Sequence, residues 1–504
     1  MRPLCLLAAS ALLASPALAQ QTLLTRSGGS LGKSLDWEIS SPKAWLLLPS
    51  LQKGPTPLSL LDPRDSRRLS VGLDLISLST VGSGGGTARK VSMPLPNSPS
   101  LAGLRLRAQF ISFPGKVLLI DQVSNATSSI LGQAGTWQSG GKMLNVARAL
   151  PTVSELKDGR VLVAGGGHGT IASGKGLDSS EFYDRDEQRF VPGPRMQVAR
   201  ALHVAVTLKD GRVLLIGGLN SAGKAIASCE IFDPQQKRFF RTGSMKASRA
   251  LHAAALLPSG KVLVCGGAQD LSDPLKAVGS ILKSSEIFDP STGRWSQGPN
   301  MGKHRAIHAI SETTGGRLLL VGGVTYGFLN LPGTTKSCEL YDPKGNRFVA
   351  TGSLPYSAGY PTLFPMRKIG GSSDELLAVG GINATINYLA AKAINRAAIY
   401  NGKTGRWTSI GNLPTATVSP ALGVAGGILH VIGGAAGSVT KPMPIASCAR
   451  YDAAAKRFYA TTKLPVSRGG AVAISLRSGQ LLIAGGGGGS SNSALDSGLF
   501  WFAR

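Results

Sequence analysis

The sequence is short of charged and aromatic residues. Of its 504 residues only 16% are charged and 6% are aromatic, whereas 66 are glycine and 29 are proline. Such a composition lacks the helix-favouring surfaces rich in Glu, Lys and Ala and contains many turn residues. We therefore expect an all-β protein of short strands, too long to be a single small module.

Acidic residues are especially scarce, with 27 Asp plus Glu against 54 Lys plus Arg and a formal charge of +27. This excess favours anionic partners. A pair of carboxylates suited to glycoside hydrolysis does not stand out. No glycine-rich phosphate loop is followed by Lys-Ser/Thr and a helix pattern. A chain without a groove of interleaved basic and aromatic residues is not expected to bind nucleic acid.

Hydrophobic runs long enough to span a membrane are missing, so we expect no membrane span. The N-terminus instead combines Arg2, an apolar run over residues 4–13 and the small-x-small end Ala17-Leu18-Ala19. This pattern predicts a secretory signal peptide over residues 1–19, cleaved after Ala19. The mature chain is therefore expected to be secreted or periplasmic.

Cysteines are few, and Cys5 leaves with the predicted signal peptide. The mature chain keeps Cys229, Cys265, Cys338 and Cys448. Three of these share one repeat position, which is held in other repeats by Ser180, Ser285, Ala397 and Ser497. We expect buried, unpaired thiols, because equivalent positions in separate repeats rarely meet the geometry of a disulfide. An oxidising compartment would permit disulfides, which remain the alternative.

The sequence does contain a repeat of about 50 residues. An apolar run ends in a Gly-Gly pair seven times, with the first glycine at Gly165, Gly217, Gly266, Gly322, Gly380, Gly433 and Gly485. A second apolar run precedes each pair, and a third strand pattern such as Glu181–Asp184 follows it. A fourth strand begins with Arg and an aromatic residue, as in Arg189-Phe190. Four antiparallel strands per repeat predict the blade of a β-propeller.

The seventh repeat ends after three predicted strands, whereas an orphan fourth-strand pattern, Thr136-Trp137-Gln138, precedes the first repeat. We expect this N-terminal strand to complete the last blade, because such closure removes both open sheet edges. The predicted propeller therefore has seven blades over residues 132–504.

The phased Gly-Gly pairs and aromatic fourth strands resemble the kelch family, which implies a kelch-type propeller. Residues 20–131 lack the repeat, and their short apolar runs predict a separate, small, sandwich-like β domain. Residues 94–109 resemble the end of β-sandwich modules attached to secreted bacterial proteins. Residues 115–120 imitate the second strand of a blade, with Asp121-Gln122 in place of Gly-Gly. A degenerate eighth blade is therefore the alternative.

The first strands of three repeats carry Arg followed three residues later by His. These candidate binding residues are Arg200 and His203, Arg249 and His252, and Arg305 and His308. First strands line the channel of a propeller, where neighbouring imidazoles could bind a metal or act as a general base. The alternative is a structural role in bonding an adjacent blade. We expect no metal site, because residues spread around a channel do not converge on one ion.

A kelch-type propeller behind an N-terminal β domain, in an exported chain, also resembles galactose oxidase. That resemblance implies a copper site of two Tyr and two His, with a Tyr-His pair after an Arg in a late first strand. The corresponding residues here are Arg468-Gly469-Gly470-Ala471, and the chain ends after the seventh repeat. In the repeats that keep His, the Tyr place holds Leu202, Leu251 and Ile307. We therefore expect no copper, no other cofactor and no catalytic residues.

The repeats differ most in length between their second and third strands, at residues 169–179, 270–284, 325–336, 383–396 and 435–447. Such loops cluster at one end of a propeller, where partners usually bind. The candidate binding residues in these loops are Tyr326, Tyr388, Lys392 and Arg396.

These patterns together predict a monomeric, non-catalytic protein that binds a glycan or a protein through its loops. Arginines in the fourth strands would also suit an anionic polysaccharide. The alternative is a propeller enzyme that acts on carbohydrate, either a galactose-oxidase-like oxidase or a sugar isomerase.

Overall fold

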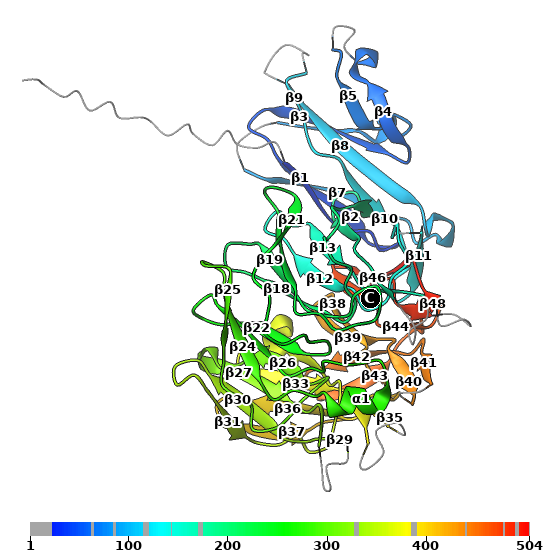
Figure 1. The fold of residues 1–504 in the computed structure, drawn as a ribbon. Helices are drawn as coiled ribbons and strands as arrows, with labels where there is room; N and C mark the ends of the chain where they lie inside the picture. Colours follow the sequence, from blue (N-terminus) through cyan, green and yellow to red (C-terminus); the bar gives the residue numbers. More distant parts are fainter. Residues whose placement is uncertain are drawn as a thin grey trace, which may run out of the picture. The chain divides into compact units, whose positions relative to one another are not determined.

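A computed structural model describes residues 23–61, 65–83, 87–113, 120–142, 144–169, 175–326, 332–384, 391–438, 441–476, 479–488 and 493–502. The predicted signal peptide and Tyr388 lie outside these residues. The chain forms two compact units (Figure 1). The first unit comprises residues 1–27, 34–94 and 104–129, and the second comprises residues 28–33, 95–103 and 130–504. Among the described residues, no helix has the length and hydropathy needed to cross a membrane.

The first unit is built from small antiparallel sheets. One contains β1 (Leu23–Gly28), β2 (Ser34–Ser40) and β7 (Arg89–Pro94). A second contains β10 (Thr127–Ile130), β8 (Arg105–Phe113), β3 (Ala44–Ser50), β6 (Thr80–Gly82) and β9 (Gln122–Val123). A third pairs β4 (Lys53–Pro57) with β5 (Arg68–Val71). Leu48, Leu69 and Ile111 pack together in its core. The described part of this unit contains no four-stranded sheet of the blade type.

The second unit contains seven four-stranded antiparallel sheets among its described residues, consistent with the predicted seven blades. We number them as blades 1 to 7. Blade 1 contains β12 (Thr152–Glu155), β13 (Val161–Ala164), β16 (Ser180–Asp184) and β17 (Arg189–Pro192), and blade 2 contains β18 (Val204–Thr207), β19 (Val213–Ile216), β20 (Cys229–Asp233) and β21 (Arg238–Arg241). Blade 3 contains β22 (Ala253–Leu256), β23 (Val262–Cys265), β24 (Ser285–Asp289) and β25 (Arg294–Gln297). Blade 4 contains β26 (Ala309–Glu312), β27 (Leu318–Val321), β30 (Cys338–Asp342) and β31 (Arg347–Thr351).

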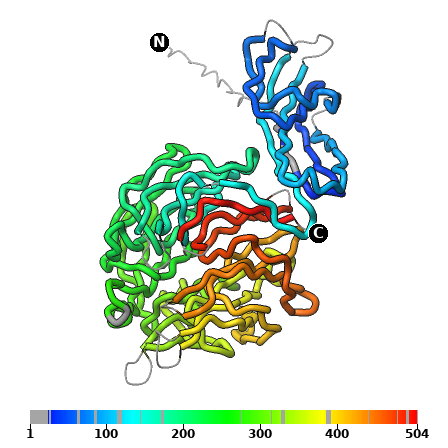
Figure 2. The backbone as a smooth tube through the Cα atoms, turned by 90° about the vertical axis from the view of Figure 1, so that its right-hand side faces the viewer, coloured from blue at the N-terminus to red at the C-terminus, as the bar shows by residue number. Residues whose placement is uncertain are grey.

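The remaining three blades follow the same pattern. Blade 5 contains β32 (Thr362–Pro365), β33 (Glu375–Val379), β36 (Ala397–Asn401) and β37 (Arg406–Ser409). Blade 6 contains β38 (Ala421–Ala425), β39 (Ile428–Ile432), β42 (Cys448–Asp452) and β43 (Arg457–Ala460). Blade 7 contains β45 (Val472–Ser475), β46 (Leu481–Ala484), β49 (Ser497–Trp501) and β11 (Trp137–Lys142). Figure 2 shows the blades following one another from cyan through green and yellow to red. The second strand of each blade is almost wholly apolar and buried, because it packs on both faces.

The predicted closure by an N-terminal strand is confirmed. Strand β11 pairs antiparallel with β49, with Trp137 opposite Trp501 and Ser139 opposite Leu499. The backbone N–H of Leu150 in blade 1 donates to the carbonyl of Gly470 in blade 7 at 2.8 Å. The last blade is thus completed by a strand that precedes the first, and no blade edge is left at the seam.

The Gly-Gly pairs join each blade to the next. The second glycine of each pair has φ between 89° and 111°, a backbone conformation that side chains other than glycine resist. Its N–H donates to a backbone carbonyl at the start of the following blade, at 2.8–2.9 Å. The seven donor–acceptor pairs are Gly166–Arg200, Gly218–Arg249, Gly267–Arg305, Gly323–Ala358, Gly381–Thr417, Gly434–Arg468 and Gly486–Arg148.

Strand register corrects one detail of the predicted repeat alignment. Ser497 does not occupy the position of Cys229; that position belongs to Gly498, which pairs with Ala484 as Cys229 pairs with Ile216. The four described cysteines are free and buried, as predicted. Burial raises the pKa of the Cys229 thiol to about 11, so the group is unreactive at neutral pH.

Replacing Gly218 by Ala is expected to destabilise the protein by about 3 kcal/mol or more. A Cβ there would lie 2.5 Å from the carbonyl oxygen of Ala201 in addition to forcing φ of +95° on alanine. Gly223→Ala carries only the φ penalty, and Gly279→Ala carries neither, because nothing lies within 4 Å of either Cβ. Urea unfolding should rank the three variants in that order, and equal stability of all three would contradict the role given to the Gly-Gly pair.

Candidate functional site

The three predicted binding arginines are buried and bonded within the fold. The guanidinium of Arg200 donates to the carbonyls of Gly217 and Ser228, at 2.9 and 2.7 Å, and to the carboxylate of Glu230 at 3.0 Å. That carboxylate also accepts the N–H of Gln197 and of Val198. The side chains of Arg200 and Glu230 are both 0% exposed.

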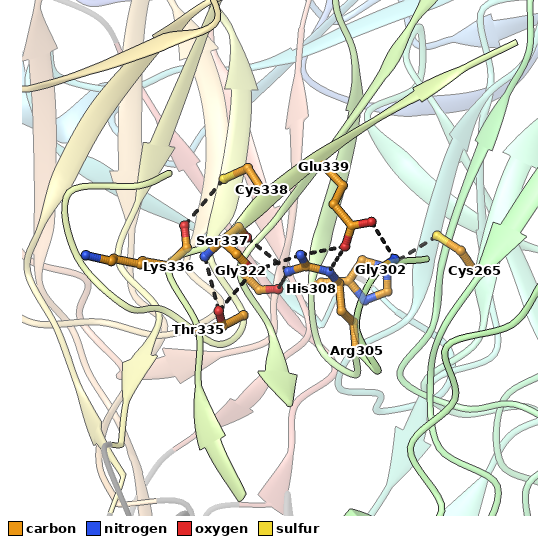
Figure 3. A network of polar contacts seen from close by, with 10 residues as sticks. All are labelled: Cys265, Gly302, Arg305, His308, Gly322, Thr335, Lys336, Ser337, Cys338 and Glu339. Carbon is orange, nitrogen blue, oxygen red and sulfur yellow. Dashed lines mark hydrogen bonds and ion pairs between the residues drawn. The ribbon is translucent and has the colours of Figure 1, made fainter. Parts of the chain in front are cut away.

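The same arrangement recurs at Arg249 with Glu286 and at Arg305 with Glu339. Figure 3 shows the guanidinium of Arg305 between Gly322, Ser337 and Glu339. We call this the arginine–glutamate lock, and Arg148 with Glu181 forms a fourth copy. Each lock holds the segment that enters a blade against the end of its second strand. Its charged groups face protein and not solvent.

The locks are lost as whole pairs in blades 5 and 6. Register places Ala358 with Ala398 in blade 5 and Thr417 with Ala449 in blade 6. Blade 7 keeps Arg468, which is bonded to Gly485 and Ser497, but has Leu499 at the position where blades 1 to 4 have Glu. Burial lowers the pKa of Arg468 to about 10, which leaves it protonated at neutral pH.

The three predicted histidines line a central cavity of about 410 Å³. The ring of His203 is hydrogen-bonded to Thr152 Oγ1 at 2.9 Å, and the ring of His308 contacts Cys265 Sγ at 3.4 Å. Burial, followed by the charge of the neighbouring arginine, lowers the pKa of each of the two to about 3. Burial lowers the pKa of His252 to about 3 as well. All three are neutral at pH 7.

A ring of residues with left-handed backbone closes one end of this cavity. We call it the collar; its members are Leu150, Leu202, Leu251, Ile307, Tyr360, Ser419 and Gly470, with φ between 47° and 63°. Backbone hydrogen bonds join neighbours in the collar, such as Tyr360 N–H to the carbonyl of Ile307 at 2.7 Å. Positive φ is rare for aliphatic residues and occurs where the surrounding structure enforces it.

Beyond the collar lies a second cavity of about 250 Å³, which we call the loop-face pocket. Its floor is the collar, and its walls come from loops between second and third strands. These walls include Ile382 of β34 (Ile382–Asn383), Ala436 of β40 (Ala435–Gly437) and Pro442 of β41 (Pro442–Pro444). Most lining residues are aliphatic, so the pocket suits an apolar group.

Sequence reasoning missed Tyr360, the largest side chain of the collar. It lines both cavities, and burial raises the pKa of its hydroxyl. The hydroxyl makes no hydrogen bond with the residues that the structure describes. The available signal was its place two residues after Ala358, which holds the Arg position of blade 5. The amino-acid sequence does not indicate that a residue other than glycine adopts a left-handed backbone at this position.

The predicted loop residues that the structure describes, Tyr326, Lys392 and Arg396, lie in the loops of this face but do not line the pocket. Tyr326, in β28 (Val324–Tyr326), donates its hydroxyl to the carbonyl of Val278 in α1 (Pro274–Gly279) and meets the ring of His304 edge-on at 5.2 Å. Lys392, in β35 (Lys392–Ala393), and Arg396 are exposed. The loops also pair with one another, as in the bridge between Lys392 and Ser438.

Comparison with known proteins gives a kelch motif at residues 249–302, which spans the lock of blade 3. Two galactose oxidase sequences from Gibberella zeae are each 39% identical to this chain over 54 residues, or 11% of this chain and 8% of the relative. The match thus covers less than a tenth of those relatives.

Solved structures extend the likeness to most of the chain. A fungal alcohol oxidase of the AA5 family, determined in complex with copper, has a TM-score of 0.54 and 17% identity over 74% of this chain and 77% of its own. The structure of YjhT has a TM-score of 0.44 and 15% identity over 60% of this chain and 94% of its own. At this level of identity, the alcohol oxidase supports the fold alone.

Breaking one lock is expected to show how strongly the contributions of its arginine and its glutamate to the free energy of unfolding depend on each other. Glu230→Ala should cost about 3–5 kcal/mol of unfolding free energy, because it strands a buried guanidinium. The double variant Arg200→Ala/Glu230→Ala imitates Ala358 and Ala398 of blade 5. Its cost should fall short of the sum of the two single variants by about 2 kcal/mol or more. Additive costs in urea unfolding would show that the pair is not coupled.

Acid should destabilise the protein through the three channel histidines. In the unfolded chain each takes up a proton below pH 6.5, whereas in the folded chain each resists protonation until about pH 3. The contribution of these histidines to stability is therefore complete above pH 6.5 and is lost as pH falls toward 3, by up to ~1.4 kcal/mol per pH unit per histidine. The triple variant His203→Gln/His252→Gln/His308→Gln should flatten the dependence of unfolding free energy on pH, whereas the exposed His168→Gln should not.

Proposed function

We propose that this chain, a kelch-repeat β-propeller protein, is an exported, non-catalytic binding protein whose partner docks on the loop face. The observation that carries the proposal is the loop-face pocket. Its floor is a rigid collar, and its walls come from the loops that vary most between blades. A rigid scaffold that presents variable loops is the usual arrangement of a recognition surface.

The chemistry of the pocket favours a protein partner over a glycan. Aliphatic side chains and backbone dominate its described lining, in which Tyr360 is the one aromatic residue. A partner that inserts an apolar side chain would bury that surface and gain from the hydrophobic effect. Exposed Lys392 and Arg396 lie in the same loop and could add charge complementarity with an acidic partner.

The repeated arginines at the start of the fourth strands give weaker support to an anionic polysaccharide. They lie at the ends of the blades opposite the variable loops, and several surface arginines there already have partners. Arg347 lies 3.8 Å from Asp342, and Arg189 lies 3.7 Å from Glu187. At a hairpin turn of blade 1, Arg160 is paired with Asp158 and stacks on the ring of Phe182.

The residues present do not fit the copper site that the galactose oxidase likeness implies. In the collar, Tyr360 stands in the Tyr place of blade 5, but the next residue is Pro361. The blades with a histidine in the following place have Leu202, Leu251 or Ile307 before it. No blade therefore supplies an adjacent Tyr and His, and no catalytic step is derived through copper.

The pocket can be blocked without touching the core. Ala436→Phe should fill the loop-face pocket and weaken partner binding roughly tenfold or more. Ala454→Phe, at an exposed turn between β42 and β43, places the same side chain at the opposite end of blade 6 and should leave binding unchanged. A partner would first be captured by cross-linking it to the loop face of the wild-type protein. Surface plasmon resonance would then compare the affinities of wild type, Ala436→Phe and Ala454→Phe for this partner, and a glycan array would test the same three proteins for glycan binding.

Two results would contradict this function. The first is equal partner binding by wild type, Ala436→Phe and Ala454→Phe, which would move the site elsewhere. The second is stoichiometric copper in the purified protein together with peroxide release from sugars or alcohols, which would make it an oxidase.

A further inference from the structure

Blade 6 carries polar residues where the other blades carry apolar ones. The residue three places before its Gly-Gly pair is His430. The equivalent residues are all leucines, at most 1% exposed: Leu162, Leu214, Leu263, Leu319, Leu377 and Leu482. The cross-strand neighbour of His430 is Arg450. Its equivalents are Phe182, Ile231, Ile287, Leu340, Ile399 and Phe500.

These polar residues line a cavity at an interface that apolar side chains fill between other blades. Between blades 1 and 2, Leu162 and Phe182 pack directly against Val213, Phe232 and Phe239. Between blades 6 and 7 there is instead a cavity of about 360 Å³. Its lining includes Ile428, His430, Arg450, Tyr459, Thr461 and Trp501. Both Ile428 and Tyr459 are partly exposed, so the cavity opens to solvent between them.

Two residues that line this cavity carry a buried hydrogen-bond donor without a partner. Trp501 is 4% exposed, and its indole Nε1–H meets no acceptor among the residues that the structure describes, nor does the buried hydroxyl of Thr461. Indoles elsewhere in the propeller are satisfied: those of Trp137 and Trp295 donate to the carbonyls of Thr462 and Gly243. An unpaired buried donor is costly, and both of these groups belong to residues that line the cavity.

The charges around the cavity select the ligand. The guanidinium carbon of Arg450 lies 5.1 Å above the ring of Tyr459, and Arg450 forms no ion pair with any residue that the structure describes. None of the lining residues that the structure describes is acidic. The imidazole of His430 lies 5.4 Å from the indole of Trp501. Burial, followed by the charge of Arg450, lowers the pKa of His430 to about 4, so this ring is neutral at pH 7.

We propose that the cavity between blades 6 and 7 binds a small organic carboxylate, which pairs with Arg450 and lies against Trp501 and Thr461. A guanidinium matches a carboxylate in geometry as well as charge. The cavity volume is that of a small-molecule site. This site is separate from the loop-face pocket, so it stands or falls independently of the proposed function.

Carboxylate binding can be measured on the full mature chain. The probes are benzoate, D-galacturonate and trigalacturonate, with benzamide and D-galactose as their neutral counterparts. Titration calorimetry should show saturable binding of at least one carboxylate and not of its neutral counterpart. In protein labelled with ¹⁵N-tryptophan, the same titration should shift the indole N–H signal that disappears in Trp501→Phe. Binding of galacturonate without trigalacturonate indicates a free acid, and binding of both indicates the end of an acidic polysaccharide.

Two variants restore the residue type found in other blades and should fold at least as well as wild type. Arg450→Leu should weaken carboxylate binding roughly tenfold to hundredfold, and His430→Leu should also weaken it. Arg238→Leu is the matched control, because Arg238 also stacks on an aromatic ring, Phe240, outside the cavity. The proposal is overturned if no carboxylate binds, if neutral probes bind equally well, or if Arg450→Leu binds like Arg238→Leu.

Discussion

Seven backbone hydrogen bonds hold the propeller together as a ring. Each runs from the second glycine of a Gly-Gly pair to a carbonyl at the entry of the following blade, and the last joins Gly486 to Arg148 across the seam. The donor can point that way only with positive φ, and a side chain there would strike the entry segment of its own blade, as a Cβ on Gly218 would strike the carbonyl oxygen of Ala201. Because these bonds fix where each blade begins, they also fix the position of the collar. In each blade the collar residue lies two positions after the residue whose carbonyl accepts the bond.

The same entry segments carry buried arginines that are paired with glutamates within the fold and are therefore not available to bind a ligand. In blades 1 to 4 the arginine that offers its backbone carbonyl to the preceding blade uses its guanidinium within its own blade, against a buried glutamate. A buried pair of this kind is expensive to break and adds little net stability over apolar packing. In blade 5 both members are replaced together, by Ala358 and Ala398, as expected for a pair that is costly to break but adds little net stability. The two proposed binding sites, the loop-face pocket and the cavity between blades 6 and 7, therefore do not use these arginines.

The period of the Gly-Gly pairs was enough to predict the sheets, the closing strand and the variable loops, because each of these follows from local turn chemistry and strand pattern. The burial of Arg200 was harder to predict, since arginine is usually exposed; only the matching period of Glu230 hinted at a pair. The misplacement of Ser497 by one residue shows that register depends on pairing across strands and not on similarity along one.

Two features were beyond sequence reasoning. The left-handed backbone of Tyr360 depends on its neighbours in the ring. His430 and Arg450 are 20 residues apart in sequence, and only the pairing of β39 with β42 shows that they share a face. The central claim is that the glycine-to-carbonyl bonds hold the ring closed, and amide hydrogen exchange measured residue by residue tests it most directly. The N–H groups of Gly166, Gly218, Gly267, Gly323, Gly381, Gly434 and Gly486 should exchange only through global unfolding, blades 5 and 6 included. Exchange of these seven as fast as that of Gly223, in an exposed loop, would contradict the account.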